Sequence, residues 1–254
     1  MRGAKTSLKV ALFGGTFDPV HVGHLAIARA AVREFGLDRV YFVPASAPPH
    51  KQRADLTEFH HRFAMLALAT EGEDRFIPSP MEAQAAGPNY SIDTVRALKK
   101  KLAKEDRLYF LIGIDAFLDL NTWRHPVELL SQCDFIVVSR PGYSLADVGK
   151  ALPEALRPDK AQLRRLRGMK TRGAITLPST TIRLLGTVKK AVSSTEIRAA
   201  AQKSPARLQR LVPPEVAAYI RKEHLYVPVP AQPEKESTIP LKVLSFDRER
   251  RSSR

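Results

Sequence analysis

Two histidines follow a pair of glycines near the start of the chain, in the segment FGGTFDPVHVGH at residues 13–24. His21 and His24 are three positions apart, so their rings share one face of a helix. A lone histidine beside an apolar stripe is usually a core group, but two imidazoles in this setting can donate hydrogen bonds to phosphate oxygens, more strongly when protonated. Zinc binding is the other use of such a pair, but no third ligand lies nearby in the sequence. We therefore predict a phosphate site and no protein-bound metal.

The residues around the histidines suit the same ligand. Gly14 and Gly15 allow the backbone to turn tightly and to approach a phosphate closely, and Thr16 offers a hydroxyl donor. The helix that follows presents unpaired N–H groups and the positive end of its dipole to an anion. We interpret Asp18 and Pro19 as turn and helix-entry residues with a structural role.

A second helix start, SSTEIR at residues 193–198, has two compatible interpretations. Ser193 and Glu196 have the S-x-x-E spacing of a capping box, which favours a well-capped helix. The dipole, three hydroxyls and one guanidinium in the same turn also favour an anion, with the side chains of Ser193, Ser194, Thr195 and Arg198 as its ligands. The residues alone favour the cap and the anion cradle equally.

Three segments between these helix starts carry side chains suited to further ligand contacts, namely VPASAPPHK (43–51), GPNYSIDTV (87–95) and FLIGIDAFLDLNTW (110–123). Asp115 follows a strand end, where a carboxylate can accept a hydrogen bond from a ribose hydroxyl. Trp123 is the single tryptophan and can stack on a flat ring, although packing is the commoner use of a lone tryptophan. Arg140, in SRPG, suits either a phosphate or the end of a strand.

Short β-branched or aromatic runs alternate with helical patterns along the chain. We predict strands at 9–13, 39–44, 107–113, 134–142, 175–178 and 182–186, and helices starting near residue 21 and covering 58–70, 90–103, 193–203 and 213–224. Alternation of this kind predicts an α/β fold, a Rossmann-like open parallel sheet with helices on both faces. Ligands bind such a sheet outside the carboxyl ends of its strands, where the two glycines stand.

Composition limits the classes of protein. With 44% apolar residues the chain of 254 residues can bury a core, and Cys133, its single cysteine, cannot form an intramolecular disulfide. No stretch approaches the ~20 apolar residues of a membrane helix, so we expect a cytoplasmic protein with no membrane partner. The net charge is +15, and residues 157–190 hold ten Lys or Arg against Asp159 alone. Such a stretch is usually a solvated helix face with a linker, and a surface for polyanions is the alternative.

The segment GGTFDPVHVGH resembles the first signature of the nucleotidylyltransferase superfamily, and SSTEIR resembles its second, an SSTxIR motif. Members of this superfamily transfer a nucleotidyl group from ATP or CTP to a phosphate acceptor. The resemblance implies that His21, His24 and Arg198 are catalytic, because they bind the triphosphate and stabilise charge as pyrophosphate leaves. It requires two helix starts, far apart in the chain, to converge on one triphosphate.

The three intermediate segments look like those of bacterial nicotinate-nucleotide adenylyltransferases, over roughly residues 8–142 and 191–226. The resemblance implies that nicotinate mononucleotide and ATP are joined to give nicotinate adenine dinucleotide and pyrophosphate in NAD biosynthesis. The implied ATP ligands are Gly14, Gly15, Thr16, His21, His24, Gly113, Asp115, Ser193, Ser194, Thr195 and Arg198. The implied mononucleotide ligands are Thr16, His50, Lys51, Tyr90, Ser91, Thr94, Trp123 and Arg140. We expect Mg²⁺ as a cofactor, bound mainly through ATP phosphates.

One domain is expected over residues 1–227, with a basic insert at about 143–190 and a disordered tail at 228–254. Two alternatives stay open. The first is a different phosphate acceptor for ATP, such as nicotinamide mononucleotide or pantetheine phosphate. The second is a basic nucleic-acid-binding protein, which is weakened because no aromatic residues interleave with the charges of residues 157–190. The sequence leaves a homo-oligomer open.

Overall fold

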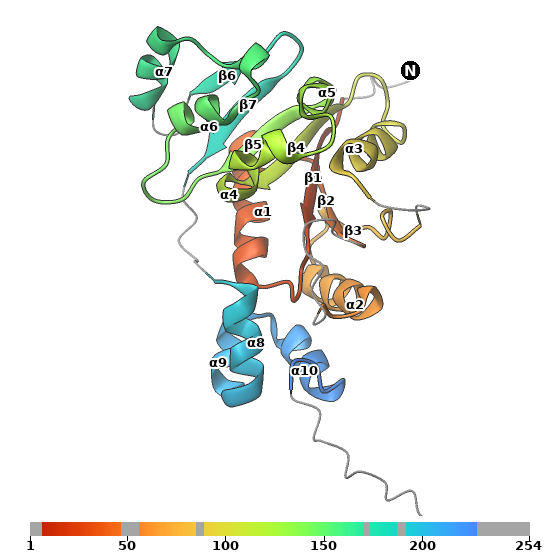
Figure 1. The fold of residues 1–254 in the computed structure, drawn as a ribbon. Helices are drawn as coiled ribbons and strands as arrows, with labels where there is room; N and C mark the ends of the chain where they lie inside the picture. The colour runs from red at the N-terminus through yellow and green to blue at the C-terminus, as the bar shows by residue number, and fades with distance from the viewer. Residues whose placement is uncertain (1–6, 47–55, 85–88, 170–172, 187–191, 228–254) are drawn as a thin grey trace, which may run out of the picture.

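A seven-stranded sheet forms the centre of the chain in the computed structural model, which describes residues 7–46, 56–84, 89–169, 173–186 and 192–227. Its strand order is β3-β2-β1-β4-β5-β7-β6 (Figure 1). All neighbouring strands are parallel except β6 and β7, which are antiparallel. The strands are β1 (Lys9–Gly15), β2 (Arg39–Pro44), β3 (Phe76–Pro78), β4 (Arg107–Gly113), β5 (Asp134–Val138), β6 (Ala174–Thr176) and β7 (Thr181–Leu185).

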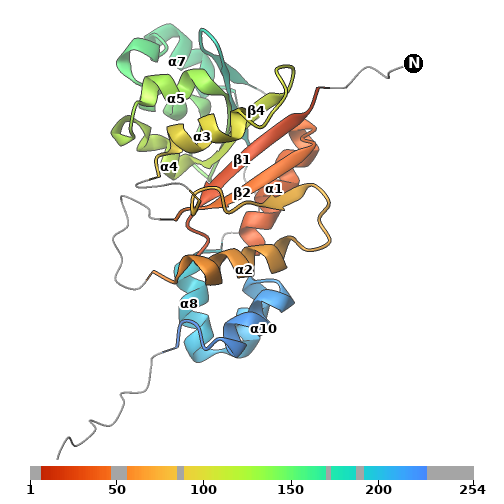
Figure 2. The same cartoon turned by 90° about the vertical axis from the view of Figure 1, so that its right-hand side faces the viewer.

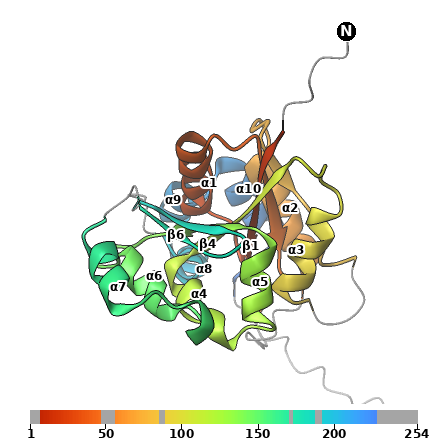
Figure 3. The same cartoon turned by 90° about the horizontal axis from the view of Figure 1, so that it is seen from above.

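Helices cover both faces of the sheet, so that two hydrophobic cores lie on its two sides (Figure 3). One side holds α1 (Val22–Phe35), α2 (Phe59–Thr70), α8 (Ser194–Lys203), α9 (Pro205–Leu211) and α10 (Pro214–Lys222). The other side holds α3 (Ser91–Lys99), α4 (Ile114–Leu118), α5 (Pro126–Gln132), α6 (Leu145–Ala151) and α7 (Lys160–Arg167), with the short 3-10 turns η1 (Leu120–Thr122) and η2 (Glu154–Leu156).

The central strand, β1, has an apolar run because side chains on both of its faces are buried. In β1 the side chains of Val10 and Leu12 pack into one core, and those of Ala11 and Phe13 pack into the other. Successive strand residues point to opposite faces, so a strand covered by helices on both sides must be apolar at every position. The run VALF therefore marks an inner strand.

A crevice for ligands is expected where the connections leave the sheet in opposite directions. The connection from β1 to β2 passes through α1 on one face, and the connection from β3 to β4 passes through α3 on the other face (Figure 2). Since β1 lies between β2 and β4, its carboxyl end is the switch point of the sheet. The histidine segment begins at this end.

The predicted Rossmann-like class is confirmed, with one difference in detail. The edge strand β6 is antiparallel to β7, whereas a parallel sheet was predicted. The predicted strand at 182–186, within the stretch 143–190, forms β7 and pairs with β5 inside the sheet. The basic side chains of α7 are exposed, as expected for a solvated helix face. The predicted tail, 228–254, lies outside the described residues, and within them no helix has the length and apolar character needed to cross a membrane.

Candidate active site

The loop between β1 and α1 turns after the glycines rather than at them. Gly14 and Gly15 still belong to β1, where they pair with Val43 and Pro44 of β2. The left-handed residue of the loop is Phe17, with φ 48°, so the expectation that the glycines make the turn was wrong. Gly15 instead packs closely against Phe17, because a Cβ there would lie 3.0 Å from its ring and the ring would have to shift.

The histidine pair caps α1 reciprocally. The Nδ1 atom of His21 accepts the backbone N–H of His24 at 3.3 Å, and Nδ1 of His24 accepts the backbone N–H of His21 at 3.3 Å. The two rings stack with centroids 3.6 Å apart and planes 19° from parallel. Because both Nδ1 atoms accept, each neutral ring carries its proton on Nε2. The cap therefore uses Nδ1 of each ring and does not use the Nε2–H groups.

Burial keeps both rings uncharged. It lowers the pKa of His21 to about 4, and together with the neighbouring His21 it lowers the pKa of His24 well below 6.5. Two stacked cations would also repel each other. In the free protein the pair therefore consists of two neutral rings and lacks the stronger donors that protonated rings would provide.

The start of α8 is capped as one of its two interpretations predicted. The hydroxyl of Ser193 accepts the backbone N–H of Glu196 at 3.1 Å. The carboxylate of Glu196 pairs with Arg207 at 2.7 Å instead of reaching back to the cap, so only half of the predicted capping box forms.

The same helix start contacts the loop that precedes the histidines. The hydroxyl of Ser194 donates to the carbonyl oxygen of Pro19 at 3.2 Å. Nη1 of Arg198 donates to the carbonyl oxygen of Asp18 at 2.8 Å, and Nη2 donates to the hydroxyl of Thr195 at 3.3 Å. Two helix starts from opposite ends of the chain thus lie against one loop, as the interpretation required, and Figure 1 shows α8 beside the beginning of α1.

A buried arginine, Arg62 on α2, braces the loops around this site and escaped the sequence interpretation. It is 1% exposed. Nη1 donates to the carbonyl oxygens of Thr16 and Ala45 at 2.8 and 2.7 Å, and Nε donates to that of Thr57 at 2.8 Å. Burial lowers the pKa of Arg62, and the nearby Asp18 carboxylate opposes this shift. In the sequence Arg62 is one polar residue of an amphipathic helix, and nothing there reveals its burial.

The turn near Tyr90 and the tryptophan segment lie together. Tyr90 is the residue before α3, as expected, and Ser91 begins the helix. The guanidinium of Arg124 lies 4.5 Å from the centre of the Tyr90 ring. The neighbouring Trp123 is half-buried, with its ring centre 6.2 Å from that of Phe110 in β4. The Arg124 contact therefore brings the residue that follows the tryptophan segment against the segment that contains Tyr90.

Thr94 is less accessible than its predicted role requires. Its side chain is buried, and its hydroxyl donates to Glu82 at 2.8 Å. The other carboxylate oxygen of Glu82 accepts the backbone N–H of Ser46 at 3.3 Å, while burial raises the pKa of this carboxyl group. Thr94 therefore joins α3 to the end of β2 through Glu82, which the sequence did not single out. The predicted ligands His50 and Lys51 lie outside the described residues.

Asp115 and Arg140 lie at the ends of two adjacent strands and bind each other. Oδ2 of Asp115 is 2.8 Å from Nη2 of Arg140, and both side chains are about half exposed or more. Gly113 ends β4 with open space where a Cβ would lie, which leaves room for a ligand beside it. Because this ion pair is exposed, breaking it costs little free energy, so each side chain can bind a substrate group in place of its present partner.

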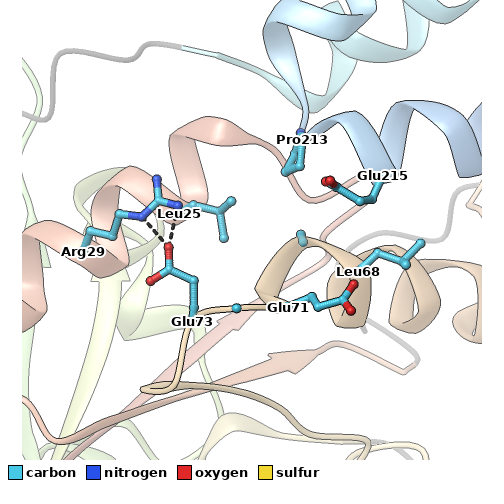
Figure 4. A pocket seen from close by; sticks show the side chains of 9 residues that line it. Leu25, Arg29, Leu68, Glu71, Glu73, Pro213 and Glu215 are labelled. Carbon is cyan, nitrogen blue, oxygen red and sulfur yellow. Dashed lines mark hydrogen bonds and ion pairs between the residues drawn. The ribbon is translucent and has the colours of Figure 1, made fainter.

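A pocket between α1, α2 and α10 is separate from these residues (Figure 4). Arg29 and Glu73 form an ion pair in its wall, with 2.7 Å between Nε and the carboxylate, while Glu71 and Glu215 add two further carboxylates. None of the predicted ligands lines it. Its acidic wall repels a triphosphate, so the candidate site is the loop and helix-start region.

Comparison with known proteins identifies the family of this chain. Residues 12–200 match the Cytidylyltransferase-like family. A Pelobacter propionicus protein named "Probable nicotinate-nucleotide adenylyltransferase" is 38% identical over 223 residues, which is 88% of this chain and 100% of that protein. One of the same name from Thermoanaerobacter sp. is 39% identical over 220 residues, 86% of this chain and 94% of that protein.

Solved structures agree on the fold. The Plasmodium falciparum nicotinic acid mononucleotide adenylyltransferase complexed with NaAD superposes with a TM-score of 0.63 at 19% identity, over 86% of this chain and 97% of that one. The curated relatives match most of the chain at 38% and 39% identity, so they show the family as well as the fold. The chain belongs to the nicotinate-nucleotide adenylyltransferase family, within the Cytidylyltransferase-like group.

Proposed function

We propose that this chain transfers the adenylyl group of ATP to nicotinate mononucleotide, which gives nicotinate adenine dinucleotide and pyrophosphate. The observation that carries the proposal is the 2.8 Å contact between Nη1 of Arg198 and the carbonyl oxygen of Asp18. It puts the guanidinium and hydroxyls of α8 beside the histidine cap of α1, where two helix dipoles favour the same anion.

The proposed reaction is a direct displacement. An ionised phosphate oxygen of the mononucleotide attacks the α-phosphorus of ATP, the bond from that phosphorus to the oxygen bridging to the β-phosphate breaks, and pyrophosphate leaves. The Nε2–H groups of His21 and His24, the first N–H groups of α1 and the guanidinium of Arg198 donate to the charge that builds on the leaving group. Catalysis then consists of alignment and charge stabilisation, and no side chain serves as a nucleophile.

Mg²⁺ is proposed as the cofactor, bound through the triphosphate. In the part of the chain that the structure describes, no group of three His, Cys, Asp or Glu side chains is arranged to hold a metal ion. The donor set around the histidines consists of N–H and hydroxyl groups, which suit phosphate oxygens better than a cation. The ion supplies positive charge to those oxygens, as Mg²⁺ usually does when it is bound by few protein ligands.

The second substrate is proposed to lie near Tyr90 and Trp123, whose rings offer flat surfaces for the nicotinate ring. The Arg124 guanidinium over Tyr90 adds a positive charge that suits an acidic ring substituent.

A cytoplasmic location stays a prediction. Cys133 is buried and unpaired.

The test is pyrophosphate release by the purified chain with ATP and Mg²⁺ against three acceptors: nicotinate mononucleotide, nicotinamide mononucleotide and pantetheine phosphate. We expect kcat/KM to be highest for nicotinate mononucleotide, with nicotinate adenine dinucleotide as the product on chromatography. Excess EDTA should abolish the activity, and added Mg²⁺ should restore it. Preference for another acceptor, or full activity in EDTA, would contradict the proposal.

A further inference from the structure

The chain turns back toward the histidine loop directly after α10. Two left-handed residues make this turn, His224 with φ 51° and Tyr226 with φ 65°. The first belongs to the helix end, because the N–H of Leu225 donates to the carbonyl oxygen of Ile220 at 3.0 Å, as in a Schellman motif. The second left-handed residue, Tyr226, lies beyond that motif. Its hydroxyl donates to Oδ1 of Asp18 at 2.7 Å.

Asp18 receives contacts from three separate parts of the chain. It is 3% exposed, and besides Tyr226 its carboxylate accepts the backbone N–H of Thr57 at 3.4 Å. Its backbone carbonyl holds Arg198. Burial and the charge of Asp18 raise the pKa of Tyr226 far above its usual value, so the hydroxyl stays protonated and donates throughout the range in which enzymes are assayed.

We propose that Tyr226 is a positioning residue for the ATP phosphates, acting through Asp18 on Arg198. The inference rests on the proposed function. The hydroxyl fixes the orientation of a buried carboxylate, and this fixes the backbone carbonyl on which the guanidinium rests. A buried carboxylate that loses a donor must recruit another, and the loop must move for it to do so. Small displacements of a phosphate ligand cost much activity, because alignment supplies much of the rate.

A backbone strained into the left-handed region supports the same role. A tyrosine at φ 65° carries a conformational cost that a glycine would not, and such residues persist where the surrounding structure over-determines them. The hydrogen bond to Asp18 is the contact that this conformation makes available. The end of the described chain is thereby tied to a loop more than 200 residues earlier.

The test compares Tyr226→Phe with Tyr219→Phe. Each substitution removes one hydroxyl. The hydroxyl of Tyr219 contacts Nδ1 of His61 at 2.9 Å, and neither of these residues belongs to the histidine loop. We expect Tyr226→Phe to lower kcat/KM for ATP about tenfold, the scale of one hydrogen bond to a charged group. KM for nicotinate mononucleotide should stay within about twofold. The control should keep wild-type kinetics, and both variants should remain folded by circular dichroism.

A second measurement separates positioning from loosening of the fold. If Tyr226 acts through Arg198, then Arg198→Lys should cost less activity in the Tyr226→Phe background than in the wild type, because the two residues are coupled. Unchanged kcat/KM for ATP in Tyr226→Phe, an equal loss in Tyr219→Phe, or strict additivity with Arg198→Lys would overturn the inference. These results would leave the proposed function intact, whereas that function fails only if the wild-type chain does not join ATP to nicotinate mononucleotide.

Discussion

His21 and His24 cap the start of α1 reciprocally: Nδ1 of each ring accepts the backbone N–H of the other residue at 3.3 Å. The arrangement fixes the tautomer of both rings without a carboxylate. Each ring thus combines a structural role at Nδ1 with a proposed ligand donor at Nε2, because the helix cap at Nδ1 directs the proton to Nε2. Substitutions at these positions must therefore separate helix stability from the proposed phosphate binding.

His24→Ala should lower kcat by about 10²-fold or more, the scale of losing one preorganised donor to developing charge. Steady-state rates at saturating ATP and mononucleotide measure the effect. Gln162→Ala is a matched control, because Gln162 stands in the same third position of a reciprocal cap, with Asp159 on α7, away from the histidine loop. It should cost about 1 kcal/mol of stability and leave kcat unchanged. A His24→Ala enzyme with near-normal kcat would refute the role given to that ring.

His21→Asn should keep the helix cap and withdraw the ligand donor, because the amide nitrogen of asparagine ends short of the position of Nε2 in the histidine ring. Asparagine is among the best residues at a helix N-cap, and its side-chain oxygen can accept the N–H that Nδ1 of His21 now accepts. We expect a free energy of unfolding within about 1 kcal/mol of wild type and a kcat at least tenfold lower. Urea unfolding and initial rates on the same preparation give both values. Parallel losses of stability and activity would indicate a purely structural histidine.

Acidification should destabilise the protein through the same pair. In the folded protein the pKa of His21 is about 4 and that of His24 is well below 6.5, whereas in the unfolded chain both titrate near 6.5. Between these values the unfolded chain binds more protons, so stability is lost as the pH falls from about 6.5 toward 4. The melting temperature should drop between pH 7 and pH 5, and the drop should be smaller in His21→Asn. An exposed histidine, His60, gives the control His60→Asn, which should keep the wild-type drop.

The sequence predicts those parts of this protein whose cause is local. Inner strands such as β1 are apolar at every position, and helix starts such as Ser193 carry their own capping residues. The superfamily motifs then indicated where a phosphate site is expected. Contacts between distant segments leave no such mark, so the burial of Arg62 and the hydrogen bond from Tyr226 to Asp18 needed the structure. The protonation state of the histidines was likewise not predictable, because burial, which lowers their pKa, is a tertiary property.

Arg62→Lys should weaken both substrate loops. The guanidinium holds carbonyl oxygens at the ends of both β1 and β2, and an ammonium group cannot reach them all from one position. We expect a loss of about 2–4 kcal/mol in the free energy of unfolding and higher KM values for both substrates. Urea titration and steady-state kinetics provide the readouts. Arg75→Lys is the control, because Arg75 is exposed and donates to a single carbonyl, that of Leu37. Equal effects of the two substitutions would show that Arg62 has no special part in bracing the loops.

Arg124→Gln should reduce the preference for an acidic ring substituent. The guanidinium lies 4.5 Å from the Tyr90 ring centre and next to Trp123, where a nicotinate ring is proposed to stack. A positive charge there favours the nicotinate carboxylate over the neutral amide of nicotinamide through a charge-assisted hydrogen bond. We therefore expect KM for nicotinate mononucleotide to rise about tenfold and KM for nicotinamide mononucleotide to change little.

The control for this substitution is Arg96→Gln. Arg96 lies on α3, the helix that follows Tyr90, but its guanidinium pairs with Glu128 and Asp93. It has the same charge, so its loss tests the general effect of removing one positive charge near α3. Arg96→Gln should leave the ratio of kcat/KM for the two mononucleotides unchanged. If Arg124→Gln also leaves that ratio unchanged, the nicotinate carboxylate must be recognised by other groups, and backbone N–H groups at the start of α3 become the next candidates because of their position at the positive end of that helix.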